Sequence, residues 1–190
     1  MYENLQIIHW PDPRLKKTSV PVERFDDRLR LLANRMLELM HAFKGVGLAA
    51  PQVGHSIRLF VMNPTGQPQD DRIYVNPALT DGDGQEEGEE GCLSLPGIYI
   101  PVVRLKTLHM QAQDVEGKPI DQVESGYLAR IWQHELDHLN GALLTDRMGA
   151  VAKLTNRKIL KELEEEYRAA HPQPIKPAPK KRLGRLLRKK

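Results

Sequence analysis

Two histidines stand four residues apart in QHELDHLNG, at positions 134 and 138, and Glu135 directly follows the first of them. Four residues of an α-helix turn through about 400°, so His134 and His138 would lie on one face, one turn apart. Such a pair can bind one metal ion, and the glutamate can act on a water that the ion holds. The spacing therefore predicts a metal-binding helix and requires a third ligand from elsewhere.

Cys92 is the strongest candidate for that third ligand. It is the only cysteine of the chain, so it forms no internal disulfide, and it lies in EEGCLSLPG, where Gly91 permits a close approach of the backbone. Thiolate is also a strong ligand for borderline metals. We predict that Cys92, His134 and His138 bind one ion, with water as the fourth ligand. Three protein ligands and one open position are typical of a catalytic site.

The segments that would position these residues follow from their periodicity. Helical patterns are predicted at residues 25–44, 124–140 and 151–170, and strands at residues 57–64, 72–77 and 104–114. The first two strands are expected to stop at Asn-Pro. Residues 81–91 are too polar and glycine-rich for a core element, so we expect an exposed loop there. Strands with helices around them favour an α+β fold with antiparallel strands.

Three separated motifs, GVGLAAPQ (45–52), EGCLS (90–94) and QHELDHLNG (133–141), occur in this order. Together they resemble the signature motifs of the peptide deformylases, and the resemblance covers roughly residues 1–168. It implies an α+β fold in which the HExxH helix lies among antiparallel strands, with one helix before it and one after it. Leu95, after EGCLS, departs mildly from the valine or isoleucine of many members.

The resemblance implies hydrolysis of the N-formyl group of formyl-methionine on new polypeptides, with release of formate. Glu135 would then take a proton from the metal's water and give it to the leaving nitrogen. The side-chain amide of Gln52 and the backbone N–H of Leu93 would stabilise the oxyanion. The family favours Fe²⁺ in the cell, while Zn²⁺, Ni²⁺ and Co²⁺ also suit a Cys/His/His site.

A substrate pocket can also be outlined from the same residues. Ile131, Arg130 and Tyr127 precede His134 by three, four and seven residues, so they share its helix face. We expect Ile131 in an apolar pocket for methionine, although ordinary core packing is an open alternative. Arg130 and Tyr127 are expected at the rim with their polar ends in water.

Glycine-rich and acidic residues complete the predicted site. Val46, Gly47 and Gly91 are expected beside the substrate backbone, where glycine permits close approach. Glu90 and Asp137 are expected to orient the loop and a histidine. An exposed surface position is the alternative for Asp137.

Composition and charge indicate one domain of residues 1–170 followed by a tail of residues 171–190. The tail contains four prolines, and residues 176–190 hold eight basic and no acidic residues. Since the formal charge is +3, residues 1–175 carry −5, from 3 − 8. We expect the tail either to be a solvated extension or to contact ribosomal RNA; an anionic membrane surface is a weaker alternative. No signal peptide or transmembrane segment is recognised, so a cytoplasmic location is expected.

Three other interpretations remain open from the sequence. An isolated HExxH also arises by chance, as a polar helix face without a metal. A metallopeptidase that cuts inside chains is disfavoured, because such enzymes usually take a downstream ligand, whereas Cys92 lies upstream. A non-catalytic protein that binds RNA or ribosomes would use the metal for structure and the tail for binding.

Overall fold

The computed structural model describes residues 2–172, so the basic segment 176–190 and most of the predicted linker lie outside the described residues. The helices are α1 (Asp27–Ala42), α2 (Gly126–Leu139), α3 (Leu144–Arg147), α4 (Ala150–Thr155) and α5 (Arg157–Ala170). The strands are β1 (Gly47–Ala49), β2 (Leu59–Met62), β3 (Arg72–Cys92), β4 (Leu95–Gln113) and β5 (Pro119–Ser125). Short 3-10 helices are η1 (Pro13–Lys16), η2 (Ala50–Val53) and η3 (Pro68–Asp70).

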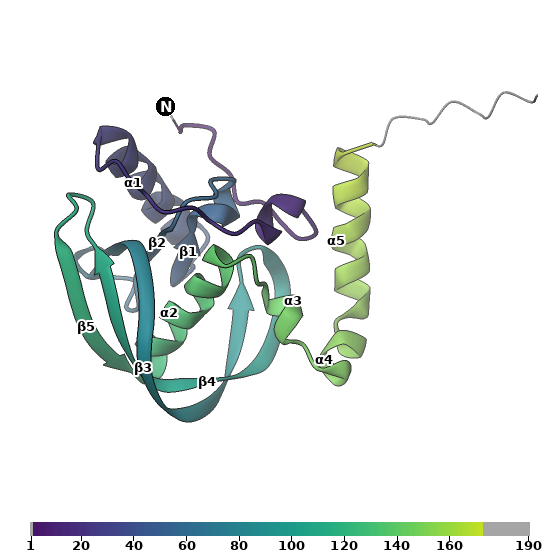
Figure 1. Cartoon of the computed structure of the whole chain (residues 1–190). Helices are drawn as coiled ribbons and strands as arrows, with labels where there is room; N and C mark the ends of the chain where they lie inside the picture. The colour runs from purple at the N-terminus through teal and green to yellow at the C-terminus, as the bar shows by residue number, and fades with distance from the viewer. Residues whose placement is uncertain (1, 173–190) are drawn as a thin grey trace, which may run out of the picture.

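Within the described residues the five strands form one antiparallel sheet in the order β1-β2-β3-β4-β5. The long strands β3 and β4 curve around α2, while α1 and α5 lie on different sides of the body (Figure 1). This arrangement confirms the expected α+β class, with the HExxH helix among antiparallel strands, an N-terminal helix and a C-terminal helix. Among residues 2–172, no helix combines the length and apolar character needed to cross a bilayer.

Helix α2 carries both histidines of the motif, which confirms the helix predicted at residues 124–140. Ile131, Trp132 and Leu139 are buried in a core shared with β2, β3 and β4, and the rings of Trp132 and Tyr74 lie nearly perpendicular, with their centroids 6.0 Å apart. Because Glu135 is four residues after Ile131, the same packing draws its carboxylate inward. The helix therefore buries part of its polar motif together with its apolar face.

The loop expected at residues 81–91 is wrong, because these residues belong to β3. From Asp83 to Gly91 they pair with β4 in a regular register, for example Gln85 with Leu105 and Gly91 with Tyr99. Their polar and glycine-rich composition reflects exposure of both faces over residues 81–87 and not a lack of strand pairing. Nor does Asn76-Pro77 end the strand: the register shifts there between Val75 and Ala78, and β3 continues.

The single helix expected at residues 151–170 is also divided. It breaks at Asn156 into α4 and α5, and the Asn156 side chain donates a hydrogen bond to the Ala152 carbonyl at 2.9 Å. Helix α5 packs Leu163 against the β4 residues Leu95 and Ile98. The strand after EGCLS is thus supported from behind by the last described helix.

The N-terminal segment ties the three sequence motifs together through its backbone. The Ile8 N–H donates to the Gln52 carbonyl at 2.8 Å, and the Trp10 N–H donates to the Ser94 carbonyl at 2.9 Å. Farther along, the Ser19 N–H donates to the Leu139 carbonyl at 2.8 Å, at the end of α2. These bonds join η2, the turn after Cys92 and the histidine helix into one unit.

The packing of α5 predicts a matched pair of stability effects. Leu163 is 6% exposed, so Leu163→Ala should lower the free energy of unfolding by about 2–4 kcal/mol through lost burial and a cavity. Leu154 on α4 is 71% exposed, and Leu154→Ala should change it by less than about 0.5 kcal/mol. Urea unfolding measures both; equal effects would show that α5 does not pack as described.

Candidate metal centre

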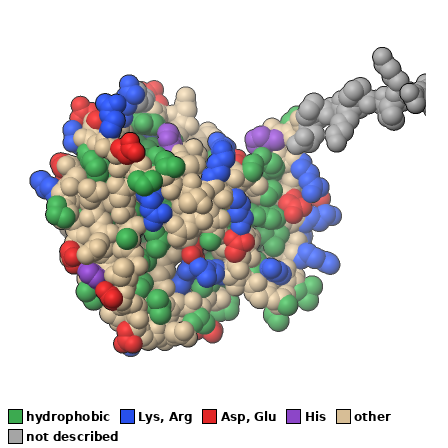
Figure 2. Space-filling model, viewed as in Figure 1, with side chains coloured by type: hydrophobic (Ala, Val, Ile, Leu, Met, Phe, Trp, Pro, Cys, Tyr) green, Lys and Arg blue, Asp and Glu red, His purple; other side chains and the backbone are tan. Residues whose placement is uncertain are grey.

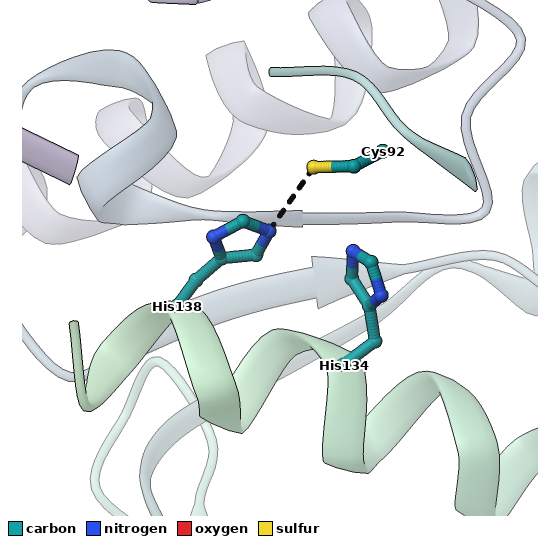
Figure 3. Close-up of side chains that lie close together, drawn as sticks. All are labelled: Cys92, His134 and His138. Atoms are coloured by element: carbon teal, nitrogen blue, oxygen red, sulfur yellow. Dashed lines mark hydrogen bonds between the residues drawn. The ribbon is translucent and has the colours of Figure 1, made fainter. Parts of the chain in front are cut away.

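Three potential metal ligands converge where β3 ends beside α2. The Sγ atom of Cys92 and one ring nitrogen each of His134 and His138 all lie within 4.8 Å of one another. Cys92 Sγ is 3.3 Å from His138 Nε2, and both rings point from α2 toward the sulfur (Figure 3). One thiolate and two imidazoles fit a borderline divalent ion and leave one coordination position open.

His138 is suited to act as a neutral ligand. It is 1% exposed, and burial, together with the charge of His134, lowers its pKa well below the ordinary value. A neutral imidazole keeps the lone pair that a metal requires.

His134 is held by a buried carboxylate. Its Nδ1 lies 2.9 Å from Glu90 Oε2, which leaves Nε2 for the metal side. Glu90 also accepts from Arg104, at 2.9 Å from both Nε and Nη2, and from Arg130 Nη1 at 2.8 Å. Burial alone would raise the pKa of Glu90, but hydrogen bonds from Arg104 and His134 outweigh it and lower the pKa to about 2. Glu90 is therefore a permanent anion that orients His134.

Asp137 supports the site indirectly, through Arg104. Its carboxylate accepts from Arg104 Nη1 at 2.7 Å and from Arg147 Nη2 at 2.6 Å, and its side chain is 16% exposed. It thus lies at the edge of the buried network and holds Arg104, the cation that binds Glu90. Its contact with the histidines is indirect.

Glu135 lies inside the site, with a buried carboxylate oxygen that is free to bind a substrate or water. It is 3% exposed, and its Oε2 has no hydrogen-bond partner within residues 2–172. Burial raises its pKa to about 7, against the opposing charge of His134. A carboxylate that can gain and lose a proton near neutrality is suited to general acid–base work.

The Gln52 side chain is aimed at the same place. Its Oε1 accepts from the Ala49 N–H at 2.8 Å, which turns Nε2 toward Ser94 Oγ at 3.2 Å and Cys92 Sγ at 3.5 Å. Gln52 is 2% exposed. The amide therefore presents N–H groups beside the candidate metal ligands. Leu93 lies in the turn directly after Cys92 and lines the same cavity.

A cavity of about 540 Å³ opens onto these groups. It is bordered by Val46, Gly47, Gly91, Tyr127 and Ile131, so the structure brings these predicted substrate residues together. Ile131 is 4% exposed and belongs both to the core and to the cavity wall, whereas Tyr127 is 53% exposed at the mouth.

The expectation that Arg130 keeps its polar end in water is wrong. Its side chain is 10% exposed, and its guanidinium donates to the carbonyls of Glu86 at 2.7 Å and Val102 at 2.8 Å, besides Glu90. A Cβ placed on Gly88 would lie 2.9 Å from the guanidinium carbon, so the missing side chain there makes room for it. Arg130 borders the cavity but its charge fastens β3 to α2.

Sequence reasoning missed Arg104, although a signal was present. Ile98, Ile100, Val102 and Arg104 alternate along β4 and all face inward. An arginine in a row of buried apolar positions indicates a buried anionic partner. His9 also borders the cavity, because its neighbours Ile8 and Trp10 bond to the carbonyls of Gln52 and Ser94.

Known proteins are similar to this chain in sequence and in fold. The family model for polypeptide deformylase matches residues 4–154. A peptide deformylase of Rhodopirellula baltica is 43% identical over 165 residues, which cover 86% of this chain and 82% of that protein. The crystal structure of a peptide deformylase from Plasmodium falciparum is 37% identical with a TM-score of 0.85, covering 88% of this chain and 100% of that one. A plant peptide deformylase, PDF1B, is 37% identical with a TM-score of 0.87, covering 92% and 96%.

Fold, ligand cluster and buried glutamate together define a metal-dependent hydrolase that acts on an amide bond. The chain belongs to the polypeptide deformylase family. Like the other members, it removes the N-formyl group from nascent polypeptides.

The buried network predicts the effect of neutralising Glu90. Glu90→Gln should weaken binding of the metal by about 10- to 100-fold, because His134 loses the anion that orients it. It should also cost about 3–5 kcal/mol of stability, because Arg104 and Arg130 keep their charges without their shared partner. Competition with a chelator measures the affinity on folded protein. Glu86→Gln, an exposed change on the same strand, should leave both quantities unchanged.

The close contact between Gly47 and Glu135 predicts the effect of enlarging Gly47. A Cβ on Gly47 would lie 2.2 Å from Glu135 Oε1, so Gly47→Ala must displace the carboxylate. We expect kcat to fall by about 100-fold or more while the metal stays bound. Gly149→Ala is the control, because no atom lies within 4 Å of its added carbon. A Gly47→Ala enzyme with full kcat would refute the assigned position of Glu135.

Proposed function

We propose that Cys92, His134 and His138 hold one divalent ion, and that Glu135 moves the protons of the deformylation reaction. The observation that carries this proposal is the meeting of three ligand atoms within 4.8 Å beside a buried glutamate with an unpartnered oxygen. Fe²⁺ is the proposed cellular ion, and Zn²⁺, Ni²⁺ and Co²⁺ are compatible with the same donors. When bound, the ion would supply a Lewis acid that activates water and polarises the formyl carbonyl.

The protein groups around it have separate tasks. Glu135 takes a proton from the attacking water and returns it to the nitrogen that leaves as a free amine. The Nε2 of Gln52 and the backbone N–H of Leu93 donate hydrogen bonds to the oxygen that gains negative charge. The bond from Ala49 to Gln52 Oε1 supports this assignment, because it leaves Nε2 as the only end of the amide that faces the site.

The substrate is proposed to be the formyl-methionyl end of a new polypeptide. Its methionine side chain would lie against Ile131 and Tyr127, and its backbone would pass Val46, Gly47 and Gly91. The cavity is mostly lined by apolar groups, which suits an unbranched thioether. Arg130 takes part through the wall that it holds, since its charge is engaged by Glu90 and carbonyl groups.

The catalytic unit is proposed to span residues 1–170, with residues 171–190 as a separate tail. The eight basic residues of segment 176–190 favour contact with ribosomal RNA, and a cytoplasmic location would place the enzyme where new chains emerge. Both basic and acidic side chains are exposed along α5 (Figure 2), where Lys158 lies 3.8 Å from Glu162 and Lys161 lies 3.5 Å from Glu165. Helix α5 is therefore of mixed charge, and the excess of basic residues belongs to segment 176–190.

Formate release tests the proposed chemistry. The enzyme, loaded with Ni²⁺ or with Fe²⁺ under exclusion of oxygen, should release formate from formyl-Met-Ala-Ser. Glu135→Gln should lower kcat by about 100- to 10,000-fold and keep the metal, because it removes the proton carrier alone.

Glu86→Gln serves as the control, since this carboxylate is exposed and lies outside the cavity. A Glu135→Gln enzyme that binds metal and works at the parent rate would contradict the role given to Glu135. Absence of turnover in the metal-loaded parent would instead reject the reaction.

A further inference from the structure

On the outer face of the β3–β4 hairpin, strand β4 carries a row of apolar side chains that is exposed in the part of the chain that the structure describes. On β4, residues 98, 100 and 102 are buried, whereas the alternating residues Tyr99, Pro101, Val103 and Leu105 face outward. Tyr99 is 64% exposed, Val103 55% and Leu105 38%. These side chains form a row about 20 Å long, at about 3.3 Å per residue. Single exposed apolar residues are common, but a continuous row on one strand indicates a contact surface.

An acidic row runs beside it on β3. Asp83, Glu87 and Glu89 lie opposite Thr107, Val103 and Pro101, on the same outer face of the hairpin. None of the three carboxylates has an ion pair or hydrogen bond in the part of the chain that the structure describes. All three are exposed. The outer hairpin face, defined as these carboxylates and the apolar row of β4, therefore offers apolar contact beside unpaired negative charge.

This face continues directly into the active-site cavity. Tyr99 and Glu89 line the cavity that holds Cys92, His134 and Glu135. The Tyr99 ring covers the α-carbon of Gly91, since a Cβ there would lie 2.6 Å from Tyr99 Cε1. A polypeptide that leaves the cavity past Tyr99 thus meets the apolar row and the acidic row next.

We propose that the outer hairpin face binds the downstream part of the substrate polypeptide, from about its fourth residue onward. The inference rests on the proposed function of the cavity. It extends the substrate-binding surface of the enzyme from the cavity onto the outer hairpin face. The ligand is an extended segment with alternating cationic and apolar side chains. Its apolar side chains pack on Tyr99 and Val103, and its lysines or arginines pair with Glu87 and Asp83. A row of about seven residues on β4 accommodates a segment of similar length.

Other occupants fit the face less well. Nucleic acid carries the same sign of charge as the acidic row. A second copy in a two-fold contact would bring two acidic rows together. The chain's own basic tail also has the right charge, so its binding to this face is an outcome for the experiment to detect.

The test compares three formylated peptides with the full-length, metal-loaded enzyme. All begin with formyl-Met-Ala-Ser; one ends there, one continues with three Lys-Leu pairs, and one continues with three Glu-Leu pairs. Formate release gives kcat and KM for each. At low salt the lysine peptide should have a KM about three- to tenfold below that of the glutamate peptide, with kcat unchanged. The difference should shrink at 0.5 M salt, because exposed ion pairs are screened.

Variants locate the effect on the hairpin. The double variant Asp83→Asn, Glu87→Gln should bring the two KM values within about twofold of each other. The control, Glu116→Gln, Glu166→Gln, removes two exposed carboxylates elsewhere and should keep the parent ratio. The proposal is overturned if the parent enzyme has equal KM values for the lysine and glutamate peptides. It is also overturned if the hairpin double variant leaves the ratio of these two KM values unchanged.

The same experiment distinguishes two other outcomes: occupation of the face by the basic tail, and failure of the proposed chemistry. If the basic tail occupies the face, the two long peptides will have equal KM values, and replacing the eight basic residues of the tail with glutamine will lower both; that result overturns the proposal. If even formyl-Met-Ala-Ser gives no formate, the proposed chemistry fails first. Turnover of that tripeptide without a charge preference rejects the docking surface alone.

Discussion

The site depends on one buried carboxylate. Glu90 accepts hydrogen bonds from Arg104, Arg130 and His134, which come from β4 and α2. An anion at this depth is stable only because it is paired and fully hydrogen-bonded. The pairing fixes three elements at once: the end of β3 that carries Cys92, the strand β4 beside it and the helix that carries both histidines. The relative positions of the three proposed metal ligands therefore depend on this ion cluster.

The rest of the fold protects that cluster and completes the cavity. The N-terminal segment bonds to the backbone carbonyls of Gln52 and Ser94, so the Gln52 amide and the Cys92 sulfur keep a fixed relation. Gly47 and Gly88 lack side chains where Glu135 and Arg130 need the space. Helix α5 packs on β4 behind the EGCLS turn. A rigid frame of this kind holds catalytic groups in position before the substrate arrives.

The sequence predicted what depends on local spacing and on residue chemistry. The helical repeat placed His134 and His138 on one face, the thiol of Cys92 was the distinctive third donor, and the apolar pattern located α1 and α2. The course of β3 through residues 81–91 was not predicted, because its partners on β4 lie 8–24 residues away and composition reports only exposure. The same error hid the role of Arg130, because two of its acceptors, the Glu86 carbonyl and the Glu90 carboxylate, belong to that strand. The break at Asn156 also lacked a Gly or Pro signal.

The most direct test of the central claim is the identity of the metal's ligands in the loaded protein. X-ray absorption at the zinc edge of Zn²⁺-loaded enzyme, with Cys92→Ser measured beside it, reports the donor atoms and their distances. We predict one sulfur at about 2.3 Å and two imidazole nitrogens at about 2.0–2.1 Å, with the sulfur lost in the variant. A spectrum with only nitrogen and oxygen donors in the parent, or one unchanged in the variant, would contradict the Cys92, His134 and His138 site.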